Sequence, residues 1–182
     1  AMTRLVLLHG FGANEDDLKP LAAELDLPLD VHCFRAPLEL AFGAFAWFPL
    51  LPDPIEGFTY DDKDVAFALD FVEDLLTEMG EPVYLGGFSQ GSMVALAVAA
   101  RRPDLVRGLW LMSGRVLRES MPAAWTPAST TLPVLIQHGT GDPVVPVEDG
   151  RATRDYLRAQ GLDPIYSEYP MGHEISRSSL KE

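Results

Sequence analysis

The sequence predicts an α/β fold, in which about six mostly parallel strands form one sheet with helices on both of its faces. Short apolar runs alternate along the chain with longer amphipathic segments, which is the pattern of repeated β-α units. Residues 5–8 form a continuous apolar run, as expected of a strand that is covered on both sides of a parallel sheet. We expect right-handed crossovers between these strands.

The expected elements follow from apolar spacing and from turn residues. Strands are expected at residues 4–9, 31–35, 83–85, 106–112, 133–138 and 165–169. Helices are expected at residues 15–25, with residues 15–17 as an acidic first turn, and at residues 64–79, 93–100 and 147–160. Gly80 suits the end of the second helix, and Pro103 lies just beyond the third. Residues 118–131 are expected to form an exposed connection with at most one turn of helix.

Residues 36–61 depart from this pattern, since they contain four prolines and two glycines and show no clean periodicity. Long loops in compact chains are usually functional. The aromatic side chains of this segment have two interpretations: a flap over the sheet edge, or one wall of an apolar pocket. We expect the loop to lie over the active-site edge, with four candidate substrate-binding residues: Phe42, Phe45, Trp47 and Phe48.

Length and charge limit the classes of function. A chain of 182 residues is expected to form a single domain, spanning residues 1–182. The formal net charge of -13 repels phosphate backbones, so no nucleic-acid partner is expected. No stretch has transmembrane length, and no secretory signal is recognised. Cys33 is the only cysteine, which fits a reducing compartment, and we expect a cytoplasmic protein.

The segment around Ser89 is the strongest motif. Gly87, Ser89 and Gly91 form a Gly-x-Ser-x-Gly pentapeptide between an apolar strand and a helix of small residues. This is the nucleophile elbow of a serine hydrolase, where a sharp turn pushes the serine hydroxyl clear of the sheet. Because the pentapeptide also occurs by chance, the hypothesis requires an acid and a histidine later in the chain.

Asp142 and His173 meet this requirement. Like Ser89, each follows the end of an expected strand, and ligands of parallel sheets bind where the strands end. The order of serine, acid and histidine is that of the α/β-hydrolases.

Other residues compete for two of the three roles. Glu148 and Asp149 are alternative acids, although both fall in the first turn of a helix, where carboxylates are expected in any case. Among the histidines, His9 and His138 precede glycine in strand-end turns that favour a structural imidazole, and His32 lies within a strand.

Four ordered motifs resemble the phospholipase/carboxylesterase family, which includes bacterial carboxylesterases and acyl-protein thioesterases. They are residues 9–12, 86–91, 138–146 and 171–175, and residues 46–48 are similar to the aromatic motif of that family. The resemblance implies a minimal α/β-hydrolase fold with Ser89 as nucleophile, His173 as base and Asp142 as its orienting acid. It also implies an oxyanion hole made by the backbone N–H groups of Phe11 and Gln90.

Three features depart from the family pattern. We expect the antiparallel strands that open many α/β-hydrolases to be absent. Residues 175–182 are expected to form only a short segment where the family would have a full closing helix, and Pro49 follows the aromatic pair where relatives often carry an acid. The first two bear on the oligomeric state, and a homodimer is an open alternative.

Together these observations predict a serine hydrolase that cleaves carboxylic esters of small to medium acyl chains through an acyl-enzyme. A thioesterase, a lactone hydrolase or a peptidase would use the same residues. A non-catalytic binding protein is disfavoured, because it has no reason to keep serine, acid and histidine at three strand ends. The expected partner is a small-molecule ester or thioester, and neither a cofactor nor a metal ion is required.

Overall fold

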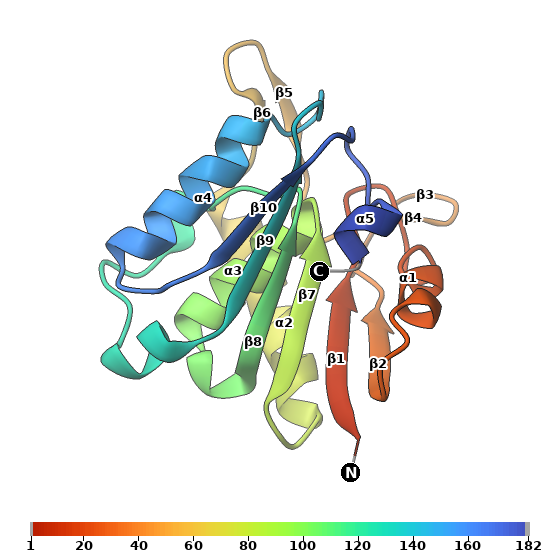
Figure 1. Ribbon diagram of the computed structural model, residues 1–182. Coiled ribbons are helices and arrows are strands. Elements are labelled where there is room, and N and C mark those ends of the chain that lie inside the picture. The colour runs from red at the N-terminus through yellow and green to blue at the C-terminus, as the bar shows by residue number, and fades with distance from the viewer. Residues whose placement is uncertain (1, 181–182) are drawn as a thin grey trace.

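The computed structural model describes residues 2–180, and a six-stranded sheet forms its centre (Figure 1). The strand order is β10-β9-β8-β7-β1-β2, and all neighbouring strands pair in parallel. The strands are β1 (Thr3–Leu8), β2 (Leu29–Phe34), β7 (Val83–Phe88), β8 (Val106–Met112), β9 (Val134–Gly139) and β10 (Ile165–Tyr169). The six predicted parallel strands are therefore confirmed.

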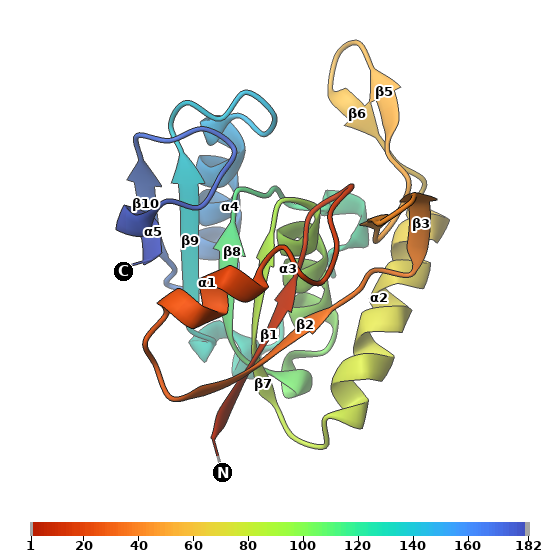
Figure 2. The same ribbon diagram turned by 90° about the vertical axis from the view of Figure 1, so that its right-hand side faces the viewer.

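Helices lie on both faces of the sheet (Figures 1 and 2). One face carries α2 (Asp62–Glu78), α3 (Gln90–Arg101) and α4 (Val147–Ala159), and the other carries α1 (Lys19–Glu24) and α5 (Arg177–Leu180). Short 3-10 segments occur at Pro103–Leu105, Arg118–Ser120 and Pro127–Thr131. The first helix is shorter than expected, because Pro20 lies in its first turn and residues 14–17 form a separate turn closed by the Asn14 side chain.

Strand β1 shows why the sheet needs cover on both sides. Val6 and Leu8 pack into the core beneath α2, α3 and α4, whereas Leu5 and Leu7 belong to the second core beneath α1. All four side chains are buried. Burying one such aliphatic side chain contributes about 1.5–3 kcal/mol, so the continuous apolar run is explained by two cores rather than one.

The position of β1 also determines where a site can form. From β1 the chain passes to β2 on one side, and then crosses by way of α2 to β7 on the other side. The strand order therefore reverses between β1 and β7. In open α/β sheets, ligands bind at such a reversal, outside the carboxyl ends of the strands.

Residues 36–61 form two antiparallel hairpins instead of the irregular loop that we expected. They pair β3 (Leu38–Ala41) with β4 (Ala44–Ala46), and β5 (Leu51–Asp53) with β6 (Gly57–Thr59). Strands of three or four residues contain too few alternations to stand out in the sequence. The β5–β6 hairpin extends beyond the carboxyl ends of the sheet strands (Figure 2). No helix within residues 2–180 combines the length and the apolarity needed to cross a bilayer.

Candidate active site

Ser89 lies in the turn between β7 and α3 with a strained backbone, at φ 56° and ψ −117°. The two neighbouring glycines make this turn possible. A Cβ atom on Gly87 would lie 2.3 Å from the Gly91 carbonyl oxygen, and one on Gly91 would lie 2.0 Å from that of Leu8. Both positions therefore exclude any side chain, and α3 can begin directly against β1 and β7.

Ser89, His173 and Asp142 form one hydrogen-bonded row. His173 Nε2 lies 3.0 Å from Ser89 Oγ, and His173 Nδ1 lies 2.7 Å from Asp142 Oδ2. The Asp142 side chain is fully buried, and its Oδ1 accepts hydrogen bonds of 2.8 Å from the N–H groups of Val144 and Val145. With its oxygens held in this way, Asp142 presents an acceptor to His173 Nδ1, and the imidazole tautomer that satisfies this contact is the one with its proton on Nδ1.

The competing acids and histidines are placed differently, although His138 Nε2 also lies 3.7 Å from Asp142 Oδ2. Asp149 forms an ion pair of 2.9 Å with Arg115, and Glu148 is exposed. His138 is buried and bonds to the Val145 carbonyl at 2.7 Å, while His32 bonds to Asp30 on the edge strand.

His9 is structural in this arrangement. Its Nδ1 donates to the Gly10 carbonyl at 2.8 Å, and its Nε2 accepts from the N–H of Ala36 at 3.0 Å. Burial lowers the pKa of His9 below its ordinary value, and this effect outweighs the raising effects of the Gly10 hydrogen bond and of the charges on Asp17 and Glu15. The imidazole is therefore held in its neutral form.

The two predicted oxyanion donors belong to the turns that follow β1 and β7. Gln90 is the first residue of α3, and Phe11 lies in the turn that follows β1. Within residues 2–180, no acceptor is hydrogen-bonded to either backbone N–H group. Both donors are thus available to a ligand atom.

A cavity of about 310 Å³ opens beside Ser89. It is lined by the loop after β1, the segment leading into α1, the turn after β7 and the segment after His173. Its lining residues are His9, Gly10, Phe11, Ala13, Asp17, Leu18, Phe88, Ser89, His173, Glu174 and Ile175. Sequence reasoning missed the apolar members Leu18, Phe88 and Ile175, because they come from three distant segments. The positions of Phe88, directly before Ser89, and of Ile175, two residues after His173, gave a signal, whereas that of Leu18 gave none.

The four aromatic residues expected to bind substrate do not line this cavity. Phe42 is fully exposed on the β3–β4 hairpin, whereas Phe45, Trp47 and Phe48 are at most 9 % exposed. Trp47 packs against the rings of His9 and Phe71. Phe45, Trp47 and Phe48 thus belong to the core, and a role for these residues in substrate binding stays a prediction.

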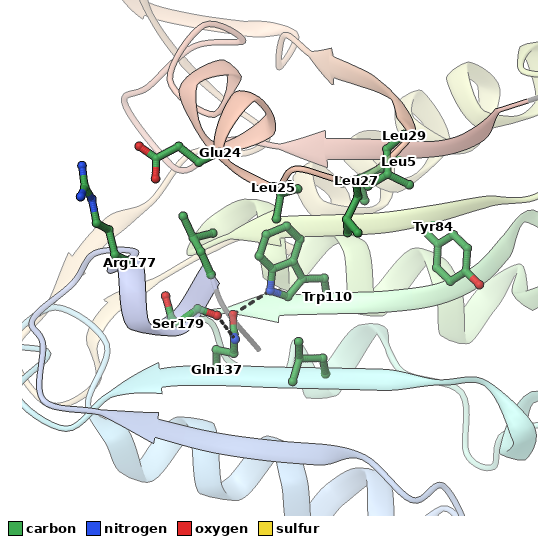
Figure 3. A pocket seen from close by; sticks show the side chains of 12 residues that line it. Leu5, Glu24, Leu25, Leu27, Leu29, Tyr84, Trp110, Gln137, Arg177 and Ser179 are labelled. Atoms are coloured by element: carbon green, nitrogen blue, oxygen red, sulfur yellow. Dashed lines mark hydrogen bonds between the residues drawn. The ribbon is translucent and has the colours of Figure 1, made fainter.

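A larger cavity, of about 730 Å³, lies on the face of the sheet between α1 and α5 (Figure 3). Its lining is mainly apolar and includes Leu5, Leu25 and Trp110. Gln137 lies between Trp110 and Ser179, and its amide is hydrogen-bonded to both (Figure 3). None of the predicted site residues lines this cavity, so its size does not make it the candidate active site.

Metal ligation finds no support in the described part of the chain. Within residues 2–180, no group of three or more histidine, cysteine, aspartate or glutamate side chains is arranged to hold a metal ion. The chemistry that the cavity offers is that of a serine hydroxyl beside an oriented imidazole.

Comparisons with known proteins show the family to which the chain belongs. The sequence model described as phospholipase/carboxylesterase matches residues 1–182. Carboxylesterase SOBER1 from Arabidopsis thaliana is 30 % identical over the whole chain, which spans 87 % of that protein. Acyl-protein thioesterase 1 from Gibberella zeae is 32 % identical over 56 % of the chain, and the match spans 45 % of the thioesterase.

Solved structures give the same result for the fold. The crystal structure of SOBER1 from Arabidopsis thaliana superposes with a TM-score of 0.82 at 26 % identity, over 100 % of this chain and 95 % of that chain. The structure of esterase PE8 gives a TM-score of 0.81 at 28 % identity, over 100 % and 89 % of the two chains. The predicted α/β-hydrolase fold is confirmed, and the chain belongs to the phospholipase/carboxylesterase family of hydrolases.

Proposed function

We propose that this protein hydrolyses carboxylic esters or thioesters of small to medium acyl chains through an acyl-enzyme on Ser89. The observation that carries the proposal is the hydrogen-bonded row of Ser89, His173 and Asp142 at the edge of a cavity. Relatives named carboxylesterase and acyl-protein thioesterase support the choice of both ester and thioester substrates.

The proposed reaction has two similar halves. His173 Nε2 takes the proton of the Ser89 hydroxyl while Oγ attacks the substrate carbonyl. The imidazolium then protonates the leaving alcohol or thiol, and the acyl group remains on Ser89. Water next repeats the attack with His173 again as base, which releases the acid and restores the serine. Asp142 orients the imidazole and stabilises its charged form in both halves.

The negative charge that develops on the carbonyl oxygen would be met by the N–H groups of Phe11 and Gln90. Gln90 adds the dipole of α3, since its N–H lies at the N-terminus of that helix. One such donor contributes about 3–4 kcal/mol to stabilisation of the transition state.

A fluorophosphonate probe tests the nucleophile, because it reacts with activated serines only. We expect labelling at Ser89, and we expect Ser89→Ala to abolish both labelling and ester hydrolysis. The matched control is Ser92→Ala, which removes another buried hydroxyl from the same turn of chain and should leave labelling intact. Labelling that persists in Ser89→Ala would contradict the proposed nucleophile.

The acid is tested by a pair of substitutions. Asp142→Asn should lower kcat about 10²- to 10⁴-fold, because the amide cannot hold His173 in the required tautomer. Asp149→Asn, which breaks the ion pair with Arg115, should change kcat by less than about threefold. The opposite result would assign the acid to the first turn of α4.

A further inference from the structure

Residues 45–48 run between the two loops that carry the proposed oxyanion donors. On one side they bond to the loop after β1: Gly12 donates to the Phe45 carbonyl, and the Phe45 N–H donates to the Ala13 carbonyl, both at 2.8 Å. The indole Nε1 of Trp47 donates to the His9 carbonyl, also at 2.8 Å. This side therefore fixes the loop that contains Phe11.

On the other side the same segment bonds to the elbow. The backbone N–H of Trp47 donates to Gln90 Oε1, and Gln90 Nε2 donates to the Phe48 carbonyl, each at 2.8 Å. Trp47 and Gln90 are each 1 % exposed, so these bonds have no competition from water. Trp47 thus uses both of its N–H groups, one on each loop.

His9 connects Trp47 to the peptide that carries the Phe11 N–H. Because its Nδ1 donates to the Gly10 carbonyl, it holds the peptide unit that joins Gly10 to Phe11. The carbonyl and the N–H of a planar trans peptide point in opposite directions, so fixing the Gly10 oxygen aims the Phe11 N–H. The His9 ring itself packs against Trp47 at 5.3 Å between ring centroids.

We propose that Trp47 is a positioning residue that fixes the spacing and direction of the Phe11 and Gln90 N–H groups. This inference rests on the proposed function, since it assigns those groups to the oxyanion hole. An aromatic residue that only filled space would keep the backbone bond to Gln90, but it would not need the indole Nε1 bond to the His9 carbonyl. The effect of an oxyanion donor depends on its distance and direction from the carbonyl oxygen. A small displacement of either loop would therefore reduce the stabilisation of the transition state more than it reduces the binding of the substrate.

Trp47→Phe is the direct test, because it keeps an aromatic ring and the backbone N–H but removes the Nε1 donor. We expect kcat for a p-nitrophenyl ester to fall about tenfold while KM stays within about twofold. The inhibition constant of an alkyl trifluoromethyl ketone, which forms a tetrahedral adduct, should rise by the same factor. Rates are expressed per active site, counted by complete fluorophosphonate labelling, so that misfolded protein does not contribute.

Trp125→Phe is the matched control. Trp125 is also buried, and its Nε1 donates to the Tyr156 hydroxyl at 2.9 Å, near the C-terminal end of α4. Neither Trp125 nor Tyr156 lines the cavity beside Ser89. The loss of this bond should leave kcat and the inhibition constant within about twofold of wild type.

Gln90→Met is a second variant that removes both side-chain bonds to residues 47 and 48 but keeps the Gln90 backbone N–H, and it should reproduce the selective loss of kcat.

Equal losses of kcat in Trp47→Phe and Trp125→Phe, or a rise in KM alone, would overturn the role of Trp47. If wild-type Ser89 is not labelled, the proposed function fails and this inference fails with it. A labelled wild type with an unimpaired Trp47→Phe overturns the inference alone.

Discussion

Gly91 illustrates how closely single residues determine the geometry around Ser89. Any side chain there would collide with the Leu8 carbonyl, so α3 could not begin where it does. The left-handed backbone of Ser89 has a cost of order 1–3 kcal/mol, which the packing of β1, β7 and α3 around it must offset. Because Gln90 follows Ser89 directly as the first residue of α3, the same turn carries both the proposed nucleophile and one of the proposed donors.

His9 gives a pH-dependent contribution to stability. Its pKa in the folded protein is lowered, chiefly by burial, whereas the unfolded chain should have a value of about 6.5. As the pH falls below about 6.5, His9 binds a proton in the unfolded chain but not in the folded chain. The folded protein therefore loses stability as the pH decreases from about 6.5 to the lowered pKa of His9. We expect Tm to fall between pH 7 and pH 5, and to fall less in His9→Asn, which lacks this ionisation.

The comparison uses the change in Tm with pH within each protein, because His9→Asn also alters packing. Carboxylates with lowered pKa contribute at more acid pH: Arg151 lowers the pKa of Glu168 to about 2, so that this pair weakens mainly below pH about 4. An identical change in Tm between pH 7 and pH 5 for both proteins would contradict a buried, neutral His9.

The elements were predictable to different extents. All six sheet strands were predictable because an apolar run followed by a turn is a local signal, and this also located Ser89, Asp142 and His173 at strand ends. The role of Trp47 was not predictable, because its partners His9 and Gln90 lie about forty residues away in opposite directions. An aromatic in a segment of irregular pattern gives the same signal whether it lines a pocket or fills a core.

The size of the cavity beside Ser89 determines which acyl-chain lengths we expect the protein to prefer. Each methylene that enters the cavity contributes up to about 0.8 kcal/mol, or about fourfold in kcat/KM, until the space is filled. We expect kcat/KM on p-nitrophenyl esters to rise from acetate to butyrate or hexanoate and then to flatten. Ile175→Trp, which fills part of the cavity, should reduce the ratio of hexanoate to acetate about tenfold.

Phe42→Ala is the control for this series, because Phe42 is fully exposed on the β3–β4 hairpin and lies outside the cavity lining. Its ester profile should match that of wild type within about twofold. A profile that changes in Phe42→Ala but not in Ile175→Trp would place the acyl chain along residues 36–61.

Over the whole molecule, most elements share a core. The larger cluster of buried side chains takes residues from β1, α2, β7, α3, β8, β9 and α4, together with Trp47 and Trp125. On the other face, Gln137 joins β8, β9, β10 and α5, since its amide bonds to Trp110, Tyr169 and Ser179. Residues from both halves of the chain therefore contribute to the larger cluster.

We accordingly propose that the chain is one domain and expect it to unfold in urea as one cooperative transition. Trp47, Trp110 and Trp125 lie near the candidate site, on the α1 face of the sheet and against α4, respectively. Variants that keep only one of these tryptophans should each show a fluorescence midpoint equal to the midpoint of their own far-UV circular dichroism. Because each variant is compared with itself, the lost packing of the other two indoles does not affect the test. A Trp125 signal that changes at lower urea than the circular dichroism would mean that the α4 side of the sheet is a separate folding unit.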